Sequence, residues 1–318
     1  MATKITDTLL QKALKDRWLI LNPNVSVEWD DAYPYYFKKL SNNLICEMSD
    51  HVYRSYNEGS GSELKKRIVK GKEYPPKMLA LKSSSAMTFN IFGNGDKEGN
   101  ITVLDNSCGL PTGKYQLEYE KKLPALNSRA PANMDACLTS QNTALLFEMK
   151  MTEWFGTPGK LSSSYLDDNS HYPDVDFRQK MQRLMSEYTI EPKDGEGRYK
   201  CKTDCFDAFQ IMKHIFGIYN GLQKKKLQKA TVIKLIVGFW TVPDDDFFEG
   251  DKNLYSAYQV TEKKMRKEFS DFHDKLGEIK NLFQMRDVHF EVMLLTVKEI
   301  VKCLKKFPVE MDALRRYL

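Results

Sequence analysis

The stretch NMDACLTSQNTALLFEMKM, residues 133–151, holds two mostly apolar runs on either side of a polar segment. Residues 133–138 and 144–151 have the length and composition of short strands. The intervening residues 139–143 (TSQNT) carry hydroxyl and amide side chains that favour tight turns. The sequence therefore predicts a β-hairpin over residues 133–151.

Two charged residues interrupt the second predicted strand. Successive side chains of a strand point to opposite faces, so Glu148 and Lys150 share one face, opposite the apolar Phe147 and Met149. Unpaired charges inside a sheet are costly, so this pair needs an explanation. It is either a structural ion pair on a solvated edge or part of a chemical site, and the strand pattern alone leaves both interpretations open.

A further carboxylate, Asp135, lies on the preceding strand of the hairpin. The short turn can bring it beside Glu148, and two adjacent carboxylates repel unless a cation lies between them. Hard oxygen ligands of this kind suit Mg²⁺. A lysine beside the metal could position or deprotonate a water molecule and stabilise charge on a phosphate. The residues thus predict a Mg²⁺ site at Asp135 and Glu148 with the Lys150 ammonium beside it.

The elements around the hairpin follow from hydrophobic periodicity and from turn and cap signals. Helices are expected over residues 5–20, 34–57, 79–92, 176–188, from Asp204 as the N-cap to about 219, over 262–284, and after a Thr296–Glu299 capping box. Further strands are expected over residues 114–119, 231–242 and 288–295. Residues 59–76, 93–113 and most of 152–200 have loop composition.

The spacing Asp135 … Glu148-Met149-Lys150 resembles the PD-(D/E)XK motif of the restriction-endonuclease-like nuclease superfamily. The predicted order of helix, three strands, helix and strand over about residues 79–242 is similar to the core of that superfamily. The phrases SSSAMTFNIFG (83–93) and LLFEMKMTEWF (145–155) resemble uncharacterised prokaryotic members. The resemblance implies an α+β (α/β) fold whose central mixed sheet is flanked by helices. It also implies an N-terminal helical extension over residues 1–78, a nuclease-like domain over 79–318 with an insertion at about 152–200, and a helical C-terminal extension.

The resemblance also implies a function. The protein would be a metal-dependent nuclease that hydrolyses phosphodiester bonds of DNA, with Asp135 and Glu148 binding Mg²⁺ (or Mn²⁺ in its place) and Lys150 activating water. Gln210 and His214, one helical turn apart, resemble the Gln-x-x-x-Tyr pair of RecB-like exonuclease modules, which implies that they line the substrate groove.

Two departures from the family pattern bear on that function. Met134 stands where many members have Pro, and residues 83–92 contain no acid, although many members carry one on the first core helix. The missing carboxylate is either absent or supplied by Glu47, Glu118 or Glu120. Its absence favours the alternative, a non-catalytic nucleic-acid-binding or assembly protein that retains a nuclease-like core.

The charge of the chain is distributed unevenly. The net charge is +5, from 48 Lys and Arg against 43 Asp and Glu, and residues 208–243 contain no acid at all. That acid-free stretch starts at the predicted helix of Gln210 and includes Lys213, Lys224, Lys225 and Lys226, which we expect to contact phosphates of the substrate. A second basic cluster, Lys65–Lys82, is the alternative path for nucleic acid. DNA versus RNA, endo- versus exonuclease action and the oligomeric state stay open.

The composition is that of a folded globular protein, with 42% hydrophobic and 29% charged residues in a chain of 318. Its longest apolar run is far too short to span a bilayer. Six scattered cysteines argue against a disulfide framework and for a reducing compartment. We therefore expect a soluble cytoplasmic protein that contacts no membrane.

Overall fold

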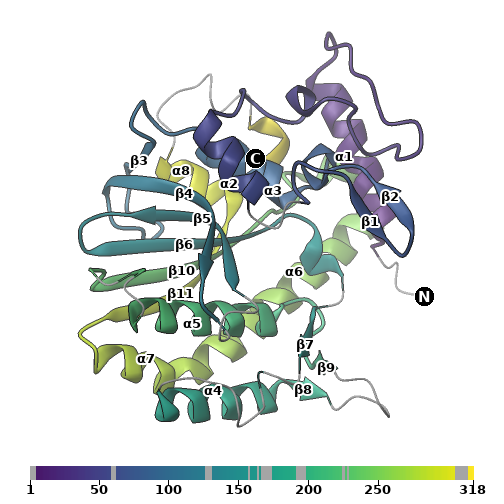
Figure 1. The fold of residues 1–318 in the computed structure, drawn as a ribbon. Coiled ribbons are helices and arrows are strands. Elements are labelled where there is room, and N and C mark those ends of the chain that lie inside the picture. The colour runs from purple at the N-terminus through teal and green to yellow at the C-terminus, as the bar shows by residue number, and fades with distance from the viewer. Residues whose placement is uncertain are drawn as a thin grey trace.

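A six-stranded mixed sheet forms the centre of the computed structural model (Figure 1). The structure describes residues 5–58, 62–125, 131–156, 158–162, 165, 174–190, 198–223, 226–227, 229–304 and 314–318. The order of the strands is β11 (His289–Thr296), β10 (Val232–Phe239), β6 (Thr143–Lys150), β5 (Ala132–Thr139), β4 (Gly113–Leu123) and β3 (Asn100–Val103). β10 is parallel to both of its neighbours, and the pairs from β6 to β3 are antiparallel.

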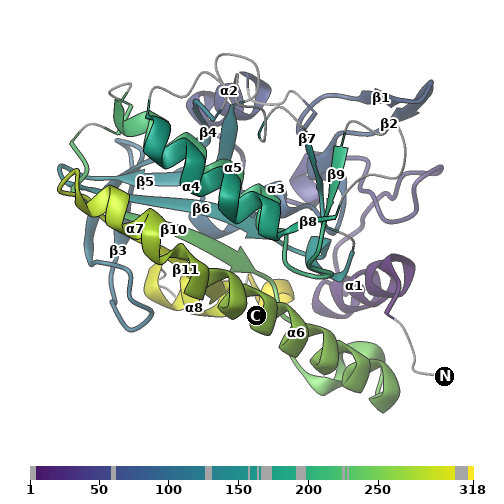
Figure 2. The same cartoon turned by 90° about the horizontal axis from the view of Figure 1, so that it is seen from below.

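Helices cover both faces of this sheet (Figures 1 and 2). Their bounds are α1 (Asp7–Leu21), α2 (Asp50–Glu58), α3 (Ser84–Phe92), α4 (Val175–Glu187), α5 (Ala208–Gln223), α6 (Lys252–His273), α7 (Gly277–Gln284) and α8 (Val297–Leu304). Two consecutive residues of β6 show which helix lies on which face, because their side chains point to opposite sides of the sheet. The Phe147 ring packs on Phe92 of α3, with ring centroids 4.9 Å apart, whereas Glu148 contacts His214 of α5. The α+β core of the restriction-endonuclease-like type is therefore confirmed.

Two smaller sheets lie outside the central one. β1 (Arg67–Val69) and β2 (Lys72–Tyr74) form an antiparallel hairpin, and β7 (Lys160–Ser162), β9 (Arg198–Cys201) and β8 (Thr189–Ile190) form a three-stranded sheet in that order. The described part of residues 1–78 thus contains α1, α2 and the β1–β2 hairpin. Leu10 and Leu14 of α1 belong to the main hydrophobic core. The domain boundary at residue 78 and the insertion at about 152–200 stay predictions.

Several local predictions are confirmed by the structure. The hairpin over residues 133–151 is β5 and β6, and the antiparallel pairing runs from Thr139–Ala144 to Ala136–Phe147. α3 ends before Gly93, whose φ of 67° lies in the region open to glycine. In the capping box before α8, the Thr296 N–H donates to Glu299 Oε2 at 2.7 Å and the Glu299 N–H donates to Thr296 Oγ1 at 3.1 Å.

Other local predictions are wrong. Residues 34–57 are not one helix: a short 3₁₀ turn (Leu40–Asn42) and α2 are separated by irregular chain. There the Asn90 side chain of α3 accepts from the Ile45 N–H and donates to the Asn43 carbonyl, so a tertiary contact replaces helical hydrogen bonds. The predicted loop 59–76 contains the β1–β2 hairpin.

The predicted N-cap and the predicted long helix also differ from the structure. Asp207, not Asp204, caps α5, because its Oδ1 accepts from the Gln210 N–H at 3.0 Å. Asp204 instead pairs with Lys264 of α6. The single helix predicted over residues 262–284 is two helices, α6 and α7, joined by a 3₁₀ turn (Asp274–Leu276).

Cysteine pairing adds one cross-link to the fold. Cys108, in the chain after β3, and Cys303 of α8 form a disulfide, while Cys46, Cys137, Cys201 and Cys205 are not bonded to one another. In the described ranges, none of the helices has both the length and the apolar character that a membrane span requires.

Gly217 allows α5 to lie directly on β4 and β5. A Cβ atom at this position would come within 2.7 Å of Ala132 Cβ and 3.1 Å of Leu123 Cβ. Although alanine is the better helix former, we expect Gly217→Ala to lower the free energy of unfolding by about 1–3 kcal/mol through overpacking. Urea denaturation measures this change. Gly277→Ala in α7, where a Cβ atom meets nothing within 4 Å, is the matched control and should not destabilise the protein. Equal effects of the two changes would contradict this account of the packing.

Candidate active site

The carboxylate of Glu148 lies in the protein interior between β6 and α5. Its side chain is almost fully buried, and three groups surround it. Glu148 Oε1 is 2.6 Å from Lys150 Nζ and accepts from Gln210 Nε2 at 2.5 Å, while Oε2 is 2.7 Å from His214 Nε2. The ion pair is therefore not on a solvated edge, which removes the simplest structural interpretation of Glu148 and Lys150.

Gln210 and His214 reach Glu148 because α5 begins beside the end of β6. Gln210 lies in the first turn of α5, just after the Asp207 cap, and His214 follows one turn later. Gln210 bridges the ion pair, since its Oε1 accepts from Lys150 Nζ at 2.6 Å while its Nε2 donates to Glu148. The helical pair that the sequence indicated thus holds both charged residues of the strand.

The ring of His214 has one engaged and one unengaged nitrogen. An ionised Glu148 carboxylate only accepts hydrogen bonds, so His214 Nε2 carries the hydrogen of the contact. His214 Nδ1 is buried and finds no hydrogen-bond partner among the described residues. Because a buried polar atom without a partner is costly, the Glu148 contact must account for the orientation of this ring.

Asp135 lies opposite Glu148 at the point where β5 and β6 separate. The described backbone pairing of these strands stops at Ala136–Phe147. Beyond that pair, Asp135 Oδ2 accepts from the Met149 N–H at 2.6 Å. The carboxylate thus takes the place of a backbone carbonyl as the acceptor for this N–H. The structure therefore brings Asp135, Glu148 and Lys150 to one place, as the sequence predicted.

The same point on β4 carries a backbone irregularity. Glu120 has a φ of 49°, and the pairing of β4 with β5 is interrupted there, between Tyr119–Ala136 and Lys121–Met134. A left-handed conformation in a non-glycine residue costs roughly 1–3 kcal/mol, and such strain concentrates at functional sites. The register places Glu120 opposite Asp135, and the Glu120 carboxylate is one of the groups that raise the pKa of Asp135.

These carboxylates line one cavity of about 400 Å³. Its acidic residues are Glu63, Glu120, Asp135, Glu148 and Glu153. Glu63 was missed by the sequence analysis, and it lies where the first-helix acid was sought: its Oε2 accepts from the hydroxyl of Ser85 in α3, and its Oε1 pairs with Lys77 at 2.7 Å. Of the three candidates for a third carboxylate, Glu120 lines the cavity, whereas Glu118 pairs with Lys121 and Glu47 is not part of the lining.

Burial and mutual repulsion control the charges of these acids. Burial raises the pKa of Asp135 far above its usual range, and the carboxylates of Glu148 and Glu120 raise it further. Burial would also raise the pKa of Glu148, but Lys150 and His214 outweigh it and hold the pKa below its usual range. Burial and the nearby Glu63 raise the pKa of Glu120 to about 7. Glu148 thus carries the negative charge, and Asp135 and Glu120 hold protons more tightly than usual.

Lys150 is a cation despite its position. Burial lowers its pKa, but the carboxylates of Glu148, Glu153 and Asp135 outweigh that effect and raise the pKa above the ordinary lysine value. It therefore keeps its proton at neutral pH in this arrangement.

The residue types of the cavity suit a hard divalent cation. Asp135, Glu148 and Glu120 offer carboxylate oxygens, and a cation among them would offset both the burial and the mutual repulsion that raise the pKa values of Asp135 and Glu120. Within the described ranges, no three acidic, histidine or cysteine side chains already converge closely enough to hold a metal. Three donors, Lys150, Gln210 and His214, occupy three of the about four acceptor sites of the Glu148 carboxylate, so a metal would take the remaining site on Oε2 or displace one donor.

The basic residues at the cavity come mainly from the N-terminal part of the chain. Arg67, Lys77 and Lys82 line it together with Lys150. Lys213 lies on α5 but is not part of the lining. Lys226 lies beyond the far end of α5, where its Nζ donates to the Lys122 carbonyl at 3.0 Å, and Lys224 and Lys225 lie outside the described residues. The cations beside the acids therefore come from the Lys65–Lys82 cluster, which the sequence offered as the alternative path for nucleic acid.

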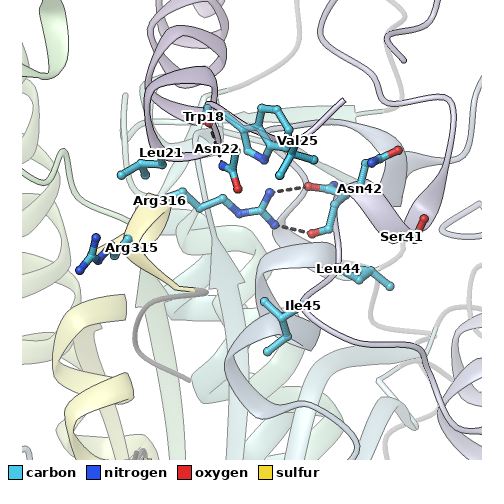
Figure 3. Close-up of a pocket in the computed structure, with 11 residues that line it drawn as sticks. Trp18, Leu21, Asn22, Val25, Ser41, Asn42, Leu44, Ile45, Arg315 and Arg316 are labelled. Carbon is cyan, nitrogen blue, oxygen red and sulfur yellow. Dashed lines mark hydrogen bonds between the residues drawn. The ribbon is translucent and has the colours of Figure 1, made fainter. Parts of the chain in front are cut away.

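Two neighbouring cavities differ in chemistry. A cavity of about 210 Å³, with Trp154, Phe239 and Met265 in its walls, adjoins the acidic cavity and shares Lys150 and Gln210 with it. A cavity of about 390 Å³ lies between α1, residues 41–45 and the C-terminal turn. Figure 3 shows Arg316 crossing this second cavity, where its guanidinium donates to Asn43 Oδ1 at 2.9 Å. No acid lines that cavity, so it is not a candidate for metal-dependent chemistry.

Comparison with known proteins identifies the family. The model of a family described as restriction endonuclease associating with ARP matches residues 17–236, more than two thirds of the chain. The chain belongs to this family. The match confirms the resemblance drawn from Asp135, Glu148 and Lys150, and it spans the acidic cavity and α5. Searches among curated proteins and among solved structures found no match.

The raised pKa of Glu120 leads to a pH-dependent prediction. A glutamate that titrates near 4.5 when unfolded and about 7 when folded destabilises the fold increasingly as pH rises through that window. In EDTA, Glu120→Gln should therefore gain stability over the wild type by roughly 1 kcal/mol or more on going from about pH 5 to about pH 8. Denaturation at the two pH values measures the difference. Glu118→Gln, on the same strand but paired with Lys121, should show no such gain. A Glu120→Gln difference that does not change with pH would contradict the assigned environment.

Proposed function

We propose that the protein is a Mg²⁺-dependent nuclease that hydrolyses phosphodiester bonds of DNA in the cavity around Glu148. One observation carries the proposal: Asp135, Glu148 and Lys150 meet at the end of β6 in a cavity lined by further acids and by cations. Membership of a restriction-endonuclease family supports the same reaction class. Mn²⁺ is expected to substitute for Mg²⁺.

Asp135 and Glu148 would hold the metal, with Glu120 as a third carboxylate. A bound Mg²⁺ supplies positive charge at the scissile phosphate and lowers the pKa of a coordinated water. Lys150 keeps its proton in the described state, so its role is to orient the water by donating a hydrogen bond and to stabilise the charge that develops on the phosphate. Gln210 fixes the Lys150 ammonium, and His214 fixes the Glu148 carboxylate.

The charge balance of the cavity also suits a nucleic-acid substrate. Arg67, Lys77 and Lys82 stand around the acids at its rim and can contact the phosphates on either side of the scissile bond. Lys77 is already paired with Glu63 at 2.7 Å, so the acid limits how far this cation can move toward a substrate.

A second function rests on the engaged state of Glu148. Because both of its oxygens are already hydrogen-bonded, the core could instead serve a non-catalytic nucleic-acid-binding or assembly protein. Such a protein would bind DNA in the absence of Mg²⁺ and would not cleave it in the presence of any divalent metal ion. Cleavage by the wild type in Mg²⁺ or Mn²⁺, absent in EDTA, separates the two functions.

The role of Lys150 predicts a loss of rate without a loss of metal binding. We expect Lys150→Ala to reduce cleavage of plasmid and of single-stranded DNA by about 10²–10³-fold. Lys234→Ala is the matched control, because Lys234 is a largely buried strand lysine that pairs with Glu291 at the other end of the sheet. The control should cleave like the wild type. Wild-type rates in Lys150→Ala would refute the role.

The role of Asp135 predicts loss of metal binding and cleavage together. Asp135→Asn retains an oxygen that can accept from the Met149 N–H, so the fold should persist. Saturating Mg²⁺ should raise the unfolding temperature of the wild type, because a ligand that binds only the folded state stabilises it, but not that of Asp135→Asn. Asp287→Asn, at a left-handed position that asparagine tolerates, controls for the charge change. An Asp135→Asn protein that is still stabilised by Mg²⁺ would place the metal elsewhere.

A further inference from the structure

The β1–β2 hairpin projects from one end of the molecule (Figure 2). Its strands are joined by a two-residue turn in which Lys70 and Gly71 both have positive φ, 51° and 77°. This turn type matches the twist of the strands and makes a compact two-stranded ribbon. All residues from 68 to 73 are exposed.

The ribbon has an unusual combination of side chains. The ribbon and the two residues before it carry five cations against the one acid Glu73, which pairs with Lys66 at 2.7 Å: Lys65 and Lys66 before β1, and Arg67, Lys70 and Lys72 in the hairpin. Between these cations lie two exposed aliphatic side chains, Ile68 at 76% and Val69 at 44% exposure. Neither aliphatic residue belongs to the core, and as consecutive strand residues they project to opposite faces of the ribbon.

The base of the ribbon is held firmly against the body. Tyr33 packs on Tyr74 with ring centroids 5.4 Å apart, and its hydroxyl donates to the Glu73 carbonyl at 2.7 Å. Arg67, whose guanidinium lies 5.3 Å from the centroid of the Tyr74 ring, also lines the acidic cavity. The ribbon is therefore anchored at its base, and its base reaches the candidate active site through Arg67.

We propose that the β1–β2 hairpin is a ribbon that enters the major groove of duplex DNA beside the cavity. This inference rests on the proposed nuclease function. The major groove admits a two-stranded β-ribbon, the lysines would contact the flanking phosphates, and Ile68 would contact base edges such as the thymine methyl group. A second copy of the chain is a poorer occupant, because two ribbons of this charge repel each other.

The test measures binding in EDTA, where no cleavage takes place. The probes are a fluorescent duplex oligonucleotide and its separate strand, titrated with the full chain at several salt concentrations. Lys65→Gln with Lys70→Asn removes two charges, and asparagine tolerates the positive φ at position 70. The slope of log affinity against log salt on the duplex should fall by about 1.8. Ile68→Ser should weaken duplex binding about tenfold without changing that slope.

Matched controls lie on the exposed face of α6. Lys252→Gln with Lys263→Gln removes two charges, and Val260→Ser alters a side chain that is 67% exposed. All three control changes should leave affinity and slope unchanged. The proposal is overturned if the hairpin variants bind like the wild type, if the α6 controls lose as much, if only single-strand binding responds, or if Ile68→Ser changes the sedimentation coefficient and not DNA binding.

Binding and cleavage fail separately in this design. If duplex binding depends on the hairpin but the wild type does not cleave DNA in Mg²⁺ or Mn²⁺, the DNA-binding role of the hairpin stands and the proposed nuclease function is refuted. If the wild type cleaves DNA with a metal but duplex binding does not depend on the hairpin, the nuclease function stands and the role of the hairpin is refuted.

Discussion

A single buried carboxylate, that of Glu148, links the central strand β6 to α5. Lys150 lies two residues further on the same strand, and Gln210 and His214 come from the helix, so the network fixes the helix against the end of the sheet. A charge this deep is tolerated only because it is paired and hydrogen-bonded on both oxygens. The close approach of α5 at Gly217 and the Asp207 cap both serve this placement, since they set where the first two turns of the helix lie.

The same network explains the division of charge in the cavity. Glu148 is paired with the Lys150 ammonium, hydrogen-bonded to His214, and ionised, whereas burial and the neighbouring carboxylates push Asp135 and Glu120 toward their protonated forms. Neighbouring acids whose pKa values are shifted in opposite directions are typical of functional sites. In the described arrangement a divalent cation would meet Glu148 at the acceptor site of Oε2 that His214 leaves open.

The sequence predicted the parts of this site that depend on local periodicity. The alternation of β6 placed Glu148 and Lys150 on one face, the turn placed Asp135 opposite, and the helical spacing paired Gln210 with His214. The central hairpin and the order of the core elements were predicted by the same patterns. Glu63 was missed because it reaches α3 from an irregular segment, through a contact with Ser85 that spans 22 residues. Glu120 was only one of three candidates, because the β4–β5 register that places it opposite Asp135 is a long-range pairing that local periodicity does not determine.

The basic residues were the least predictable part. The acid-free stretch after residue 208 drew attention to Lys224–Lys226, but α5 is long, and its C-terminal end lies roughly 14 Å along the axis from His214. The cations at the cavity come instead from Arg67, Lys77 and Lys82, whose place depends on the path of residues 62–83. Linear charge density identified a basic segment near α5 but could not show which end of the helix faces the acids.

The most direct test of the account is a crystal of the wild type soaked in Mn²⁺, with anomalous scattering recorded at the manganese edge. The account predicts one strong peak between the carboxylates of Asp135 and Glu148. A fully ordered site without that peak at saturating Mn²⁺ would contradict it.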